Sequence, residues 1–167
     1  MAEVRLRLSD DHHAVSEVLE QLLTALENKD VQTSHSRLDL LWARLAVHIR
    51  AEHLHLFPTV MSRRLTEAQP VVENLRADHD FFMRELARAI SILRDDSTDV
   101  TRWVVVDDAV RAVGKRLVTH NEIEETTIYP WCASLLTEPE QVELITRINR
   151  ELENRPPRFS LETWINQ

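Results

Sequence analysis

The sequence has very little of the two residues that most often shape tight turns and crosslinks. It contains one glycine, Gly114, one cysteine, Cys132, and six prolines. A lone cysteine excludes an internal disulfide framework. Because tight β-turns depend on glycine, this composition offers little turn chemistry for a β-rich fold. These scarcities favour an all-α protein.

Long apolar runs are also missing. A membrane-spanning helix needs roughly 18 consecutive apolar residues, and no segment comes near that length. Residues 1–13 alternate charged and apolar side chains and lack the apolar core of a signal peptide. We therefore expect a cytoplasmic protein that does not interact with membranes.

Positive charge is too sparse for a nucleic-acid surface. The formal net charge is −8, from 20 lysines and arginines against 28 aspartates and glutamates. Nucleic-acid-binding domains present a basic patch, and this sequence has no cationic run interleaved with aromatic residues. Nucleic acid is therefore not an expected partner.

The sequence is rich in helical periodicity. Leucine, alanine, glutamate and arginine, all good helix formers, are frequent. Apolar residues recur three and four positions apart in four long segments, which predicts an up-down-up-down four-helix bundle. The four stripes run through Val15, Leu19, Leu22 and Leu26; through Leu38, Leu41 and Leu45; through Leu75, Phe82, Leu86, Ile90 and Leu93; and through Val106, Val110, Val113 and Leu117.

A chain of this length suits one domain. We place the bundle in residues 1–154, together with a short fifth helix over residues 138–152, and treat residues 155–167 as a C-terminal tail. Phe159 and Trp164 give the tail apolar character. We expect it to dock on the bundle, on a second copy of the chain in a homodimer, or on another protein.

A polar motif occurs twice along the stripes. In each half, an Asp-His pair is followed by H-x-x-x-E and then by an aromatic-proline pair five positions beyond the glutamate. On an α-helix, residues four apart share a face. A single H-x-x-x-E motif is more often an exposed pair, but two in the same context indicate a shared function. The residues are Asp11, His12, His48, Glu52, Phe57 and Pro58 in the first half, and Asp78, His79, His120, Glu124, Tyr129 and Pro130 in the second.

In the predicted bundle, four of these imidazoles and the two carboxylates face one interior. Burying an unpartnered carboxylate costs several kcal/mol, and no lysine or arginine lies at an assigned interior position. A bound metal would supply the missing positive charge and accept the imidazole lone pairs. Two central carboxylates can bridge two cations, which leaves two imidazoles for each. Nitrogen and oxygen donors suit iron, manganese or zinc.

Over residues 8–136, these motifs resemble the hemerythrin-like, or HHE cation-binding, family. Members of this family are four-helix bundles with a non-haem di-iron centre. The resemblance therefore implies two iron ions joined by an oxo or hydroxo bridge. The ligands that it implies are His12 and His48 on one iron, His79 and His120 on the other, and Glu52 and Glu124 as bridges.

One position departs from the oxygen carriers of that family. They have a further histidine four residues before the one at His79, and here that position is Leu75. Leucine cannot bind a metal, so we expect an open position on one iron. His55 is either a substitute ligand, an outer group or, as we favour, a partly solvated residue near the helix end. His53 points about 100° away from Glu52 on an ideal helix and is expected to be exposed.

Two classes of function remain open from the sequence. The first is a binding or sensing protein for oxygen, nitric oxide or peroxide. The second is a di-iron enzyme that consumes peroxide or oxidises iron, or a protein that stores or donates iron in a stress response. The missing histidine at Leu75 favours peroxide, nitric oxide or redox chemistry over simple oxygen carriage.

Overall fold

The computed structural model describes residues 3–95 and 99–154 of the chain. Every regular element within these ranges is helical, which confirms the all-α prediction. The predicted docking of the tail lies outside the described residues. In chain order the elements are α1 (Glu3–Glu27), α2 (Val31–Ala51), η1 (Glu52–Leu56), α3 (Phe57–Arg63), α4 (Leu65–Arg94), α5 (Thr101–Ile123), η2 (Glu124–Ile128), α6 (Tyr129–Leu135) and α7 (Glu138–Glu153), where η denotes a π-helix.

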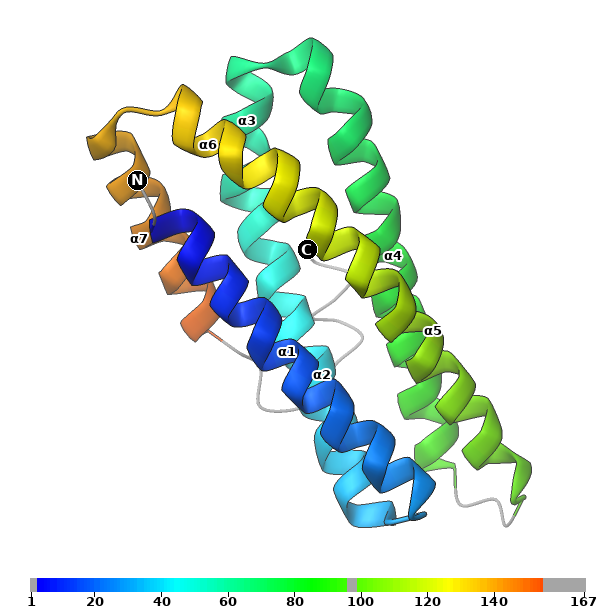
Figure 1. Ribbon diagram of the computed structural model, residues 1–167. Coiled ribbons are helices and arrows are strands. Elements are labelled where there is room, and N and C mark those ends of the chain that lie inside the picture. Colours follow the sequence, from blue (N-terminus) through cyan, green and yellow to red (C-terminus); the bar gives the residue numbers. More distant parts are fainter. Residues whose placement is uncertain (1–2, 96–98, 155–167) are drawn as a thin grey trace.

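Four long helices form the body of the molecule (Figure 1). α1 and α2 run side by side in opposite directions, and α4 and α5 form a second antiparallel pair. α1 also packs on α5, and α2 packs on α4, so the four helices enclose a common interior. The predicted fifth helix is α7, which lies against α1, α2 and η1. None of the described helices is both long and apolar enough to cross a membrane.

α1 begins well before the first residue of its predicted apolar stripe. Ser9 is a residue type favoured at the N-cap, which would predict a helix start there, but it lies inside the helix, which starts at Glu3. The reason is that Val4 and Leu8 extend the apolar stripe by two turns and are buried against the end of the bundle that α7 covers. Burial of this extra stripe outweighs the capping preference.

Two of the long helices, α2 and α5, change to a π-helix (η1 and η2) just before a proline and then continue as α3 and α6. The N–H of Phe57 donates to the carbonyl of Glu52, and the N–H of Tyr129 donates to that of Glu124, both five residues back. Pro58 and its counterpart Pro130 have no N–H to donate, and the wider π turn accommodates their rings. A proline inside a helix usually kinks or ends it, but here each helix only widens locally and then continues as α3 or α6.

The polar residues of the repeated motif lie between two apolar clusters. One cluster is formed by the four long helices around Trp42 and Phe82. The other surrounds η1 and η2, includes residues of α3, α6 and α7, and contains Phe57 and Tyr129. Water is therefore excluded from both sides of the polar layer, which raises the cost of any unbalanced charge there.

Candidate metal centre

The six side chains that the sequence singles out meet in the bundle interior. All six are buried, and Glu52 and Glu124 are 0% exposed. Their ligand atoms form two groups of four, and the atoms of each group lie within 4.8 Å of one another. Both glutamates belong to both groups. The groups are His12, His48, Glu52 and Glu124, and Glu52, His79, His120 and Glu124.

The two oxygens of Glu52 point to different groups. Oε1 lies 3.0 Å from Nε2 of His48, and Oε2 lies 3.2 Å from Nε2 of His79. Each oxygen therefore faces an imidazole from a different half of the chain.

Glu124 repeats this arrangement. Its Oε2 lies 3.1 Å from Nε2 of His12, and its Oε1 lies 3.2 Å from Nε2 of His120. Both carboxylates thus span the space between the two groups.

These short separations fit ligands of one cation better than hydrogen-bonded pairs. Both oxygens of Glu52, Oε1 of Glu124 and Nε2 of His48 have no hydrogen-bond partner, although other donor atoms lie close by. Two ligands at right angles on a cation, with bonds of about 2.1 Å, are roughly 3 Å apart. The donor atoms are therefore spaced and oriented as the ligands of bound cations would be.

Without a metal, protons balance the charge of this layer. Burial alone would lower the pKa of His120, but the charge of Glu124 and the hydrogen bond to Asp78 raise it to about 9. Burial also opposes the charged form of His48, while Glu52 and Asp11 raise its pKa well above the ordinary value. Protons and metal ions would therefore compete for the same imidazole nitrogens.

The carboxylates are kept ionised by the same contacts. Burial would raise the pKa of Glu124, but His120 and His12 lower it well below the ordinary value. Burial and the charge of Glu124 act against the ionised form of Glu52, and His48 and His79 still lower its pKa. Two anions are thus held close together in an apolar interior, where a divalent or trivalent cation is strongly favoured.

Each imidazole is also held from behind through its other nitrogen. The acidic partners come from neighbouring helices: Asp11 precedes His12 in sequence, yet its carboxylate accepts from His48. A carboxylate acceptor favours the tautomer with its hydrogen on Nδ1, which leaves Nε2 free to bind a cation at the centre. The four contacts of Nδ1 are His48 to Asp11 at 2.8 Å, His120 to Asp78 at 3.1 Å, His12 to Glu125 at 3.1 Å and His79 to Nε2 of His53 at 2.9 Å.

Two arginines complete this outer layer. Arg44 lies 3.7 Å from Asp11, and Arg116 donates to Asp78 at 2.5 Å. Burial would raise the pKa of Asp78, but His120 and Arg116 lower it. These arginines were missed in the sequence, although each stands four residues before a motif histidine, so the repeat is in fact R-x-x-x-H-x-x-x-E.

The prediction that His53 is exposed is wrong. Its ring is partly buried, and its Nε2 lies within hydrogen-bond distance of Nδ1 of His79, at 2.9 Å. Burial, followed by the neighbouring His79, lowers the pKa of His53 to about 4, so it is neutral at pH 7. The π-helix is the reason: it advances less than 100° per residue, so residue 53 stays closer to the direction of Glu52.

His55 and Leu75 do not add donors to the centre. His55 contacts Glu151 of α7 at 3.5 Å, outside the polar layer. Leu75 is fully buried in the apolar cluster around η1 and η2. The group that contains His79 therefore gains no further ligand from Leu75, and the additional histidine near it, His53, contacts the ring of His79 from outside the centre.

The two aromatic residues of the motif close the glutamate side of the layer. The hydroxyl of Tyr129 donates to Oε2 of Glu124 at 3.3 Å and lies 3.2 Å from Nε2 of His12. Phe57 stacks on the ring of His79, with an interplanar angle of 10°. One half of the chain thus offers a phenol and the other an apolar ring at equivalent positions.

A small cavity lies on the histidine side of the layer. The space in which the centre of a water molecule could move is about 10 Å³, so the cavity can hold about one water molecule. Besides the four histidines, its walls are the apolar residues Val15, Leu45, Ile49, Phe82 and Leu117, with Asn121 as the one further polar side chain that lines it.

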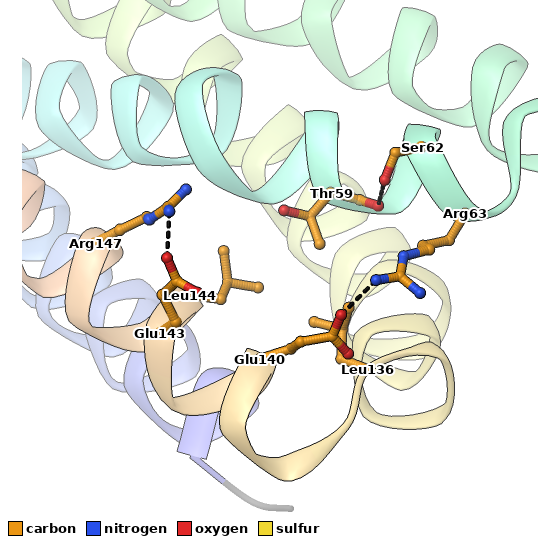
Figure 2. Close-up of a pocket in the computed structure, with 8 residues that line it drawn as sticks. All are labelled: Thr59, Ser62, Arg63, Leu136, Glu140, Glu143, Leu144 and Arg147. Atoms are coloured by element: carbon orange, nitrogen blue, oxygen red, sulfur yellow. Dashed lines mark hydrogen bonds and ion pairs between the residues drawn. The ribbon is translucent and has the colours of Figure 1, made fainter.

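A separate surface groove between α3 and α7 lacks this chemistry. Figure 2 shows that Arg63 and Arg147 are directed at Glu140 and Glu143, with which they form ion pairs. No histidine or cysteine lines this groove. Its charged groups already satisfy one another, so the interior layer is the candidate site.

Comparison with known families identifies the chain. The sequence model described as Hemerythrin HHE cation binding domain matches residues 6–132. The protein therefore belongs to the hemerythrin HHE cation-binding family, and its two histidine–glutamate groups are compatible with metal binding. Comparisons with curated proteins and with solved structures returned no match.

Proposed function

We propose that this chain is a non-haem di-iron protein that binds or senses a small ligand: oxygen, nitric oxide or peroxide. The observation that carries the proposal is the pair of fully buried glutamates, each with its two oxygens divided between two groups of imidazoles. Three of these four oxygens have no hydrogen-bond partner. A pair of cations would neutralise the carboxylates and occupy the orphaned atoms.

In this proposal each cation receives two imidazole nitrogens and one oxygen from each glutamate. Such a nitrogen and oxygen donor set, with coordination positions left open, is the kind that non-haem iron uses. The proposed ligands are His12 and His48 for one iron, His79 and His120 for the other, and Glu52 and Glu124 as bridges.

The residues around the centre would control what reaches it. When bound, the irons would supply open, redox-active coordination positions. The apolar walls and small volume of the cavity favour a small guest over a bulky substrate. Tyr129 holds a proton at the edge of the layer, because burial and the charge of Glu124 raise the pKa of its hydroxyl well above the ordinary value.

The test is reconstitution with Fe²⁺ under argon, followed by absorption spectra with oxygen, nitric oxide or hydrogen peroxide. A binding protein gives a spectral change that reverses when the ligand is removed. Continuous release of oxygen from excess peroxide would instead support the enzymatic alternative. No spectral change with any of the three ligands would contradict both.

A matched pair of variants links the ligand to the cavity. Val15→Leu adds one methylene at a residue that lines the cavity, whereas Val18→Leu adds it at a buried residue of the same helix that does not line it. We expect Val15→Leu to weaken ligand binding severalfold with unchanged iron content. Val18→Leu should leave binding unchanged. Equal effects of the two substitutions would show that the ligand does not bind in this cavity.

A further inference from the structure

The inner donors do not distinguish the two proposed iron positions. Each group contains two imidazoles and shares the same two glutamates. Asp11 and Asp78 also act alike, because each accepts from one imidazole in its group and is approached by an arginine. Any difference between the positions must therefore come from the remaining contacts.

Besides Tyr129 beside His12 and Phe57 beside His79, the two groups differ at the residues that directly follow the two glutamates. In η2, Oε1 of Glu125 lies 3.1 Å from Nδ1 of His12. In η1, the same place is taken by His53, whose Nε2 lies 2.9 Å from Nδ1 of His79. One imidazole is thus backed by a carboxylate and the other by a second imidazole.

The chemistry of these two acceptors is unequal. Nε2 of His12 and of His79 face the glutamates, and in the proposed centre these nitrogens bind the cations. With Nε2 bound to a cation, Nδ1 of each ring carries the hydrogen and donates it outward. A carboxylate acceptor draws that hydrogen more strongly than a neutral imidazole does, which makes the donating ring a more electron-rich ligand. The His12 ring therefore donates more strongly than the His79 ring.

We infer that Glu125 and His53 are positioning residues that make the two iron positions electronically inequivalent, with the His12–His48 position the more electron-rich. This inference rests on the proposed di-iron centre. A stronger donor set stabilises Fe³⁺, so the iron held by His79 and His120 is the first to accept an electron. Reduction would then proceed in two distinct one-electron steps.

The test exchanges the two acceptors. His53→Glu gives both imidazoles a carboxylate, and Glu125→His gives both a neutral ring. Each variant is loaded with ⁵⁷Fe, its iron content is measured, and its Mössbauer spectrum is recorded. An electrode then supplies one electron to each Fe³⁺, converting it to Fe²⁺, while the two potentials are measured.

The wild type should show two Mössbauer doublets of equal area and two separate potentials. Either single exchange makes the outer acceptors alike, so the separation of the potentials narrows in both variants. Their mean potential should move in opposite directions, downward in His53→Glu and upward in Glu125→His. The double exchange again gives one imidazole a carboxylate and the other a neutral ring, so the separation should return with the two positions reversed.

Two substitutions close to the centre serve as controls. His55→Gln alters a residue that pairs with Glu151 of α7, and Glu122→Gln alters an exposed residue of α5, so we expect unchanged potentials in both. Two bound irons with a single doublet, or potentials that shift the same way in both exchanges, would overturn this inference alone. A wild type that binds no iron would overturn the proposed function and this inference together.

Discussion

The two halves of the chain place the same inner residues around the centre but surround them differently. Residues 11–58 and 78–130 each contribute an Asp-His pair, an R-x-x-x-H-x-x-x-E motif and a π-helix before a proline. They differ where the first half has His53 and Phe57 and the second has Glu125 and Tyr129. The shared residues are therefore the ones compatible with metal binding, whereas the residues that differ give each half its own surroundings.

The strongest loss of iron should follow substitution of either glutamate that the two groups share. Glu52→Gln and Glu124→Gln should each lose most of both irons, because each glutamate belongs to both groups. Bound iron stabilises only the folded state, so its loss should lower the free energy of unfolding by about 4 kcal/mol and the Tm by roughly 10 °C. Metal analysis and thermal unfolding measure both effects. His12→Ala is the control and should retain about one iron per chain; if Glu52→Gln retained as much, the glutamate would not be a bridge.

The next effect is a pH dependence that the metal-free form shows and the iron-loaded form lacks. The pKa of His120 is about 9 in the folded chain, above its ordinary value of 6.5. In the metal-free protein its stabilisation, on the order of 3 kcal/mol, is complete below pH 6.5 and is lost as the pH rises through 9. Iron requires neutral imidazoles, so stabilisation by iron should grow over the same interval. Tm values of both forms between pH 6.5 and 9.5 measure the two trends.

His53 does not disturb this test, because its pKa of about 4 keeps it neutral throughout the interval. Parallel trends in the two forms would contradict competition between protons and iron at the imidazoles.

A smaller effect should be equal in the two halves. Asp11→Asn and Asp78→Asn each weaken the support of one imidazole, and loss of such an outer contact typically lowers metal affinity 10- to 100-fold. Competition with a chelator measures this affinity. Asp10→Asn, which alters an exposed neighbour, is the matched control. A large effect of only one of the two buried variants would show that the halves are not equivalent at this level.

The smallest effect concerns the aromatic pair. Tyr129→Phe removes one hydrogen bond to Glu124 and makes the second half resemble the first. We expect a loss of about 1 kcal/mol in the free energy of unfolding and no change in iron content. Denaturant titration measures the first and metal analysis the second. Loss of iron in Tyr129→Phe would assign the phenol a direct role in holding the metal.

The histidines and glutamates at the centre could be predicted from the sequence because their arrangement depends only on helical spacing. His48 and Glu52 share a face in any regular helix, and the second copy at His120 and Glu124 marks the pair as functional. The bundle follows from the same periodicity. By contrast, an ideal α-helix turns His53 away from the centre, and only the π-helix returns it.

A sequence signal for that π-helix did exist. The aromatic residue of each motif lies five positions beyond its glutamate, which is one π turn, and a proline follows at once. The contacts across helices could not be predicted in this way. That Asp11 supports His48, and not the adjacent His12, depends on how α1 is rotated against α2, which spacing within a helix does not specify.

The proposed pair of irons is best tested by measuring the iron content of the purified chain after anaerobic reconstitution with Fe²⁺ and removal of unbound metal. We expect about two irons per wild-type chain and little iron in the Glu52→Gln variant. A wild-type chain that takes up no iron, or that binds as much as the Glu52→Gln variant, would contradict this proposal.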